Sequence, residues 1–171
     1  RAHRTRNVSG WTNNYYDDMA WLGLALERAQ RQHFAGNRGG IQQIEMELFD
    51  AWAPAEGGGI PWRKKSDFYN APANGPAAIL LARTGRLWRA QEMADWMDRT
   101  LKDPRTGLVL DGMHSTRALV DAGKTGEMER AVYSYCQGVT LGLETELAVR
   151  LGEPRHAERV HALVDAVDNH L

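Results

Sequence analysis

The chain has little cysteine, no excess charge of either sign and no long apolar run. Only one of its 171 residues, Cys136, is a cysteine, so neither an intramolecular disulfide nor a cysteine zinc cluster can form. A formal net charge of −1 gives no electrostatic footprint for nucleic acid or for an anionic membrane. No apolar run approaches the roughly 20 residues of a membrane span, so no transmembrane segment is expected.

Several catalytic signatures are also missing from the sequence. There is no His-Glu-x-x-His zinc motif, no phosphate-binding glycine loop and no Gly-x-Ser-x-Gly nucleophile elbow. His156 and His161 fall on different faces of an expected helix, so neither a metal nor any other cofactor is predicted. No apolar segment of a signal peptide follows Arg1-Ala2-His3-Arg4, which leaves the compartment open between cytoplasm and export.

Helical patterning dominates what the sequence does contain. Apolar residues at helical spacing predict six helices. Their approximate ranges are 14–33, 40–52, 74–84, 87–101, 135–150 and 154–171. Residues 54–70, which include Gly57-Gly58-Gly59, are expected to form a loop. Residues 108–111 are briefly strand-like, and residues 118–130 are expected to be a polar connection.

The helices alternate in character and recur. The first, third and fifth are apolar almost all round, whereas the second, fourth and sixth are amphipathic, which indicates inner and outer helices respectively. The inner helices recur about every 60 residues after similar aromatic-polar segments. We therefore predict an all-α fold, a curved α/α array of three inner/outer hairpins forming one domain over residues 1–171. If the array closes, the aromatic-polar segments gather at one mouth.

Adjacent carboxylates, Asp17 and Asp18, stand where a polar aromatic segment becomes the first inner helix. Two carboxylates are the minimum equipment for glycoside hydrolysis, one as acid and the other as nucleophile or base. Like charges placed this close raise one pKa, which keeps an acid available near neutral pH. The alternative is that the acids only favour the helix start, with Asn14 as the N-cap and Asp17 completing a capping box.

Other polar and aromatic residues lie near the starts of the inner helices. Trp62, on the glycine loop, either stacks on a sugar ring or packs back on the core. Asn70, Asn74 and Gln137 suit a hydroxyl-rich ligand, although Asn74 serves equally well as an N-cap. Asp111 either binds a hydroxyl or is a turn carboxylate.

Five segments together resemble glycoside hydrolase family 76, the endo-α-1,6-mannanases and their fungal cell-wall relatives. They are YDDMAW (16–21), GGGIPW (57–62), YNAPANGPAA (69–78), DPRTGLVLDG (103–112) and YSYCQG (133–138). The resemblance implies an (α/α)6 toroid that cleaves α-1,6-linked mannan, or a mannose-containing oligosaccharide, with retention. It implies that Asp17 is the nucleophile and Asp18 the acid/base. The substrate-binding residues would be Tyr16, Trp62, Asn70, Asn74, Asp111, Tyr135 and Gln137.

The sequence departs from the family pattern in length and in local charge. Such a toroid has about twice as many helices as are predicted here. Either the chain is an internal part of a longer domain, or it is an open half-ring whose apolar faces lead to self-association. Arg63-Lys64-Lys65 is more basic than the family pattern, which suggests the hypothesis of a substrate with anionic groups.

Three further interpretations stay open. The same covalent intermediate serves a transglycosylase, in which a sugar hydroxyl replaces water as the acceptor. A non-catalytic carbohydrate-binding half-barrel would bind mannan without turning it over. A helical-repeat interaction scaffold would do neither.

Overall fold

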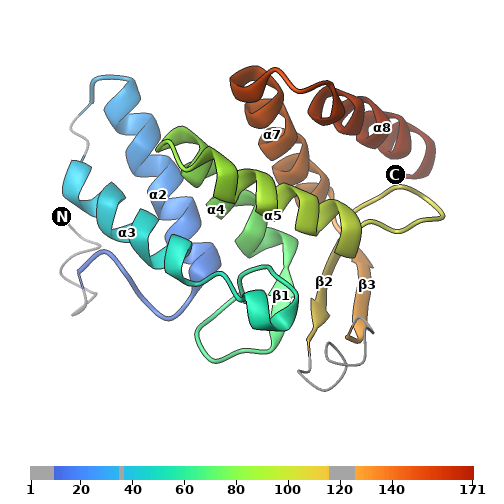
Figure 1. The fold of residues 1–171 in the computed structure, drawn as a ribbon, viewed down its shortest axis with the longest axis horizontal. Coiled ribbons are helices and arrows are strands. Elements are labelled where there is room, and N and C mark those ends of the chain that lie inside the picture. Colours follow the sequence, from blue (N-terminus) through green and yellow to red (C-terminus); the bar gives the residue numbers. More distant parts are fainter. Residues whose placement is uncertain (1–9, 35–36, 116–125) are drawn as a thin grey trace.

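The computed structural model describes residues 10–34, 37–115 and 126–171, and within these ranges it is mainly helical (Figure 1). Three helical hairpins follow one another along the chain. The helices are α2 (Tyr16–Arg31), α3 (Arg38–Asp50), α4 (Ala71–Arg83), α5 (Leu87–Thr100), α7 (Ser134–Leu151) and α8 (Pro154–His170). A 3-10 turn, η1 (Pro54–Glu56), and three strands, β1 (Phe68–Asn70), β2 (Leu110–His114) and β3 (Met128–Val132), complete the described part.

The hairpins are α2–α3, α4–α5 and α7–α8, and they pack side by side around α4. Helix α4 contacts α2 on one side, α7 on the other and α5 along its length. Residues 73–82 of α4 are all buried, as expected for an inner helix. Helices α2 and α7 each keep an exposed side, where Trp21 is 50% exposed and Val149 is 80% exposed. The predicted all-α hairpin array is confirmed.

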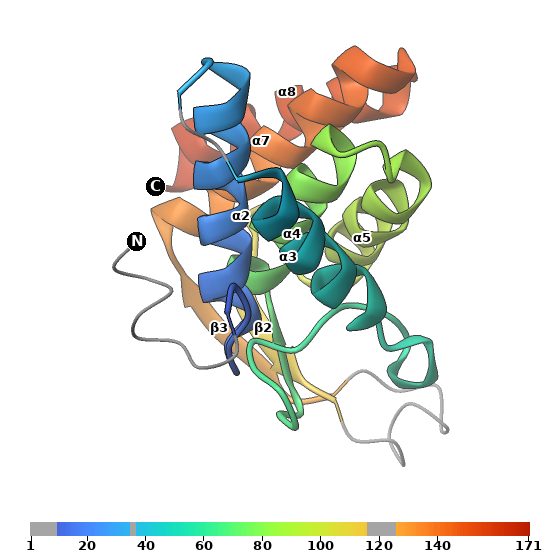
Figure 2. The ribbon, with the colours of Figure 1, turned by 90° about the vertical axis from the view of Figure 1, so that its left-hand side faces the viewer.

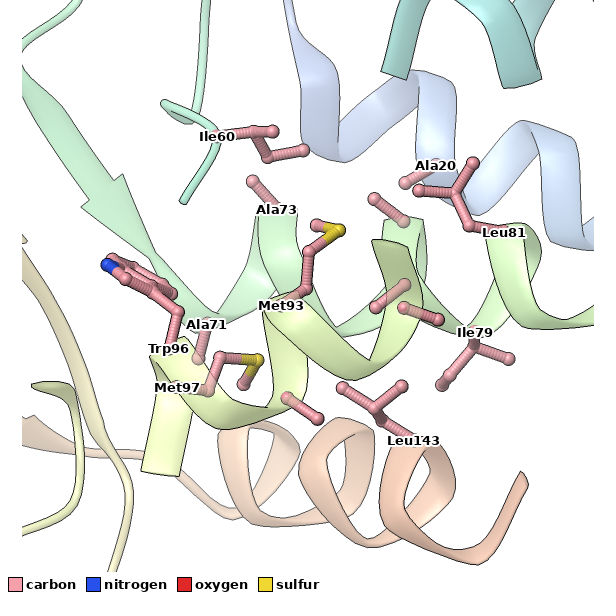
Figure 3. Packing of buried hydrophobic residues seen from close by; sticks show 14 of the residues in the cluster. Ala20, Ile60, Ala71, Ala73, Ile79, Leu81, Met93, Trp96, Met97 and Leu143 are labelled. Carbon is pink, nitrogen blue, oxygen red and sulfur yellow. The ribbon is translucent and has the colours of Figure 1, made fainter. Parts of the chain in front are cut away.

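Small residues on α4 let its neighbours approach closely. Ala71 and Ala73 lie next to Met93, Trp96 and Met97 of α5, as the close-up of the core shows (Figure 3). All five side chains are at most 2% exposed, so this contact is removed from water. Small side chains on α4 thus face larger sulfur-containing and aromatic side chains on α5.

Two helix starts differ from the sequence prediction. Helix α4 begins at Ala71 rather than near residue 74, because the Asn70 side chain accepts the Ala73 N–H and Pro72 suits the first turn. Helix α2 begins at Tyr16 with no side-chain cap, so the expected N-cap at Asn14 was wrong. The Asn14 carbonyl instead accepts a hydrogen bond from the Lys64 N–H at 2.8 Å.

A small antiparallel sheet lies at one end of the helices in both ribbon views (Figures 1 and 2). Its strand order is β1-β2-β3, with Tyr69 opposite Met113 and Leu110 opposite Val132. The brief strand predicted at 108–111 is confirmed in part by β2. The polar connection predicted over 118–130 was wrong for residues 128–130, which belong to β3. Residues 118–125 lie outside the described residues. Strand β3 has two exposed and three half-buried residues, so it lacks the alternation of buried and exposed side chains that marks a strand with one buried face.

No helix in the described ranges is long and apolar enough to cross a membrane. Cys136, the single cysteine, is buried at the third position of α7. Desolvation raises the pKa of its thiol to about 12, so the thiol is protonated at neutral pH.

The close approach of α4 to α7 gives a stability prediction. A Cβ added at Gly75 would lie 2.6 Å from Val139 Cγ2 and 2.8 Å from Val139 Cβ. Because Val139 is β-branched and buried, Gly75→Ala should lower the free energy of unfolding by about 1–3 kcal/mol. Denaturant unfolding followed by tryptophan fluorescence measures this change.

The matched control is Gly138→Ala on the exposed side of α7, where an added Cβ meets nothing within 4 Å. Helix propensity alone should then raise the free energy of unfolding by about 0.5–1 kcal/mol. Two changes of the same sign would contradict the assignment of Gly75 to a close helix contact.

Candidate active site

The N-terminal ends of the three inner helices lie at the end of the molecule that carries the sheet (Figures 1 and 2). Helix α2 presents Asp17 and Asp18 in its first turn, and α7 presents Tyr135 at its second position. Strand β1 leads directly into α4, and β3 is followed by α7 after Tyr133. The short sheet therefore sets where two of the three helices begin.

The acid pair is held partly by its own helix. The Asp17 Oδ1 atom accepts a hydrogen bond from the Asp18 N–H at 2.8 Å. Burial raises the pKa of Asp17, the Asp18 N–H opposes that rise, and the neighbouring carboxylate of Asp18 adds to it. Asp17 is half-buried and Asp18 is exposed. Within the described ranges neither carboxylate is bound in an ion pair, so both remain accessible to a ligand.

The loop of residues 57–66 lies against the start of α2. The Tyr16 N–H donates to the Trp62 carbonyl at 2.9 Å, and Tyr15 forms a bridge with Arg63. The ring of Trp62 lies 5.4 Å from that of Tyr15, and its Nε1–H donates to Ser66 Oγ at 2.9 Å. Trp62 is thus fixed beside the two residues that precede the acid pair, and its side chain remains partly exposed.

Tyr16 faces the loop and α3. Burial raises the pKa of its hydroxyl, Glu47 raises it further, and Lys64 opposes them. Lys64 Nζ lies 2.6 Å from Glu47 Oε1, so its charge is paired inside the protein. Tyr16 therefore belongs to a polar contact between α2, α3 and the loop.

A second polar group lies on the α7 side. The Tyr135 hydroxyl donates to Asp111 Oδ1 at 3.4 Å, and the ring of Tyr135 stacks on that of Tyr133 at 5.3 Å. Burial raises the pKa of Asp111, whereas the Tyr135 hydroxyl lowers it. Tyr133 and Tyr135 are both nearly half exposed. Sequence reasoning missed Tyr133 and also Tyr15; each directly precedes the first turn of an inner helix, and that position was the available signal.

The predicted amides lie inside the framework. Asn74 is fully buried, accepts the Ile60 N–H at 2.8 Å and donates to the Ile60 carbonyl at 2.8 Å and the Asn70 carbonyl at 2.9 Å. Gln137 is 2% exposed and makes the corresponding bonds to Val109 N–H, Val109 carbonyl and Tyr133 carbonyl. Asn70 caps α4. These three side chains are buried and bonded to backbone groups, whereas Tyr16, Trp62 and Asp111 are partly exposed and Tyr135 is exposed.

Metal-binding geometry is not present in the described ranges, where no group of three or more His, Cys, Asp or Glu side chains is placed to hold an ion. His156 is fully buried, with its Nδ1 atom 2.5 Å from Glu144 Oε2, and this pair joins α8 to α7. His161 is exposed on α8.

Comparison with known families identifies the chain. A profile of glycosyl hydrolase family 76 matches residues 5–171. The chain belongs to this family. A comparison with curated proteins finds no significant match.

Solved structures of family 76 proteins share the fold. An α-1,6-mannanase from a Salegentibacter species is 26% identical, with a TM-score of 0.84 over 97% of this chain and 50% of that one. A variant of that mannanase, described as inactive, has two consecutive aspartates changed to alanine and was solved with α-1,6-mannotetraose. It is 25% identical, with a TM-score of 0.83 over 96% of this chain and 50% of that one. A Listeria innocua protein is 25% identical, with a TM-score of 0.82 over 98% of this chain and 49% of that one. The family 76 chain described here thus spans about half the length of these proteins.

The buried amide of Asn74 gives a prediction that separates framework from ligand binding. Asn74→Ala leaves the Ile60 N–H and carbonyl without partners in a dry environment, so the free energy of unfolding should fall by at least about 1–3 kcal/mol. Denaturant unfolding measures the change. The exposed Asn169→Ala is the control, expected to change it by less than about 0.5 kcal/mol. Equal stability of the Asn74 variant and the parent would contradict a framework role.

The pKa of Asp17 gives a pH-dependent prediction. A carboxyl whose pKa is higher in the folded than in the unfolded state binds more protons when folded, so stability falls as the pH rises above the ordinary value of 3.8 and through the raised value. Asp17→Asn removes this ionisation and should raise the Tm slightly at pH 7. The gain should disappear near about pH 3, where the carboxyl is protonated in both states.

Thermal unfolding followed by circular dichroism at both pH values measures this difference. Glu158→Gln, an exposed neutralisation in the first turns of α8, is the control and should show no such gain. A lower Tm for Asp17→Asn at pH 7 would mean that helix-terminus attraction outweighs burial.

Proposed function

We propose that this chain carries the catalytic acids of a glycoside hydrolase that cleaves α-1,6-linked mannan with retention of configuration. One observation supports this most directly. Asp17-Asp18 is the only pair of consecutive aspartates in the sequence, and a related mannanase is described as inactive when two consecutive aspartates are replaced. In the present chain the pair stands in a helix first turn, accessible and beside an aromatic loop.

In the proposed mechanism Asp17 is the nucleophile and Asp18 the acid/base. Asp17 attacks the anomeric carbon while Asp18 protonates the leaving glycosidic oxygen, and Asp18 then removes a proton from the water that hydrolyses the glycosyl-enzyme. The backbone hydrogen bond on Asp17 Oδ1 fixes the orientation of that carboxylate, as a nucleophile requires. Asp18 is exposed and has no ion-pair partner in the described ranges, so the glycosidic oxygen and then a water molecule can reach its carboxyl group.

The raised pKa of Asp17 opposes this order, because a nucleophile acts as the ionised form. Burial alone would give Asp17 the acid role and Asp18 the nucleophile role. Chemical rescue by azide separates the two assignments, because the nucleophile variant and the acid/base variant give glycosyl azides of opposite configuration.

Single variants test the pair. Asp17→Asn and Asp18→Asn should each lower turnover of α-1,6-mannan by at least about 10²–10⁴-fold, because each removes one half of the double displacement. Binding of α-1,6-mannotetraose, measured by calorimetry, should persist. The control Asp50→Asn, at the exposed end of α3, should retain turnover.

Rescue by azide distinguishes the two roles. With an aryl mannoside that has a good leaving group, azide should restore the nucleophile variant and give a glycosyl azide of inverted configuration. The acid/base variant should give the retained configuration. Absence of both turnover and mannotetraose binding in the parent chain would overturn the proposed function.

A further inference from the structure

Arg63 is an exposed cation at the edge of the candidate active site. Its guanidinium carbon lies 5.1 Å from the centroid of the Trp62 ring. Within the described ranges no carboxylate forms an ion pair with Arg63. One face of the guanidinium is therefore held against the indole, and its N–H groups are available to a ligand.

The backbone places this cation close to the acid pair. Tyr15 and Arg63 form an antiparallel bridge, flanked by the Tyr16 N–H to Trp62 carbonyl bond at 2.9 Å and the Lys64 N–H to Asn14 carbonyl bond at 2.8 Å. That pattern makes Tyr15 and Arg63 a non-hydrogen-bonded pair, whose side chains lie close together on one face. Tyr15 precedes Asp17 by two residues, so the backbone of Arg63 lies beside the segment that leads into the acid pair.

The neighbouring lysines differ in availability. Lys64 Nζ lies 2.6 Å from Glu47 Oε1, so the charge of this member of the Arg63-Lys64-Lys65 segment is paired within the protein. Lys65 is exposed and has a positive φ of 62°, in a turn that is closed by the Ser66 N–H donating to the Arg63 carbonyl at 3.2 Å. Arg63 thus has a second positive charge on the same turn, one that forms no ion pair with any of the residues the structure describes.

We propose that Arg63 binds an anionic substituent of the glycan, of the phosphate-ester class, at the rim of the site. The proposal rests on the proposed function, because it assumes that a mannan occupies the mouth. The ionised nucleophile would repel an anionic glycan, and a cation on the rim offsets that repulsion. A guanidinium held on one face presents a planar fork of donors that matches two phosphate oxygens, and Lys65 adds a point charge.

The test compares two glycans that differ only in charge. A phosphorylated α-1,6-mannan and the same polymer after phosphatase treatment are titrated into the chain at low and high salt. The parent should bind the phosphorylated polymer about tenfold more tightly at low salt, and the preference should shrink at high salt. Arg63→Gln should bring the two affinities together while leaving affinity for the neutral polymer unchanged. Arg63→Lys should keep part of the preference, because lysine retains the positive charge but lacks the paired N–H donors of a guanidinium.

The matched control is Arg28→Gln, which removes an exposed arginine from the last turn of α2. It lies about 16 Å along the helix from Asp17, by the ordinary rise per residue, and should leave the preference intact. Equal affinity of the parent for both polymers, or an equal effect of Arg28→Gln and Arg63→Gln, overturns the role of Arg63. In that event, turnover of neutral mannan still supports the proposed function. If neither polymer is bound, both proposals fail.

Discussion

The three hydrogen bonds of the Asn74 side chain are the constraint on which the candidate site depends. They fasten Ile60, at the end of the glycine-rich loop, to the first turns of α4 in a fully buried setting. The loop reaches that position because Gly58 and Gly59 have positive φ and lie against Trp96, where a Cβ would be within 2.9 Å of the indole. Only two residues further on, the Trp62 carbonyl accepts the Tyr16 N–H. The Asn74 side chain thus fixes the loop that packs against the start of α2.

The next hairpin repeats this arrangement, in which a buried amide side chain at the start of an inner helix bonds to the backbone of a distant loop residue. Asn74 is the fourth residue of α4 and Gln137 is the fourth residue of α7, and each pairs with both backbone groups of one loop residue and with a carbonyl four residues earlier. In α2 the fourth residue is Met19, which is 1% exposed and apolar. The second and third positions there carry Asp17 and Asp18. The hairpin that presents the acids has an apolar anchor where the other two have a polar clamp.

Helices, hairpin order and the acid pair could be predicted from the sequence because each rests on local pattern. The roles of the polar side chains could not. Asn74 and Gln137 have the composition of sugar ligands, and only the distant partners Ile60 and Val109 reveal that their hydrogen-bonding capacity is already filled. Strand β3 was missed for a related reason, since its pairing partner rather than its own apolar pattern stabilises it. Long-range backbone partners carry the information that the sequence pattern lacks.

In the first turn of α2 the Asp17 side chain bonds to the helix backbone and is also one of the two adjacent carboxylates. No side chain caps this helix from outside, and Asp17 Oδ1 accepts the Asp18 N–H within the turn. That bond favours the ionised carboxylate, whereas burial beside the aromatic loop opposes it, and burial has the larger effect. Because Oδ1 is held by the backbone, the second oxygen of the same carboxylate is oriented without any further residue. The backbone of the helix start thus restricts the Asp17 carboxylate without help from a residue outside the helix.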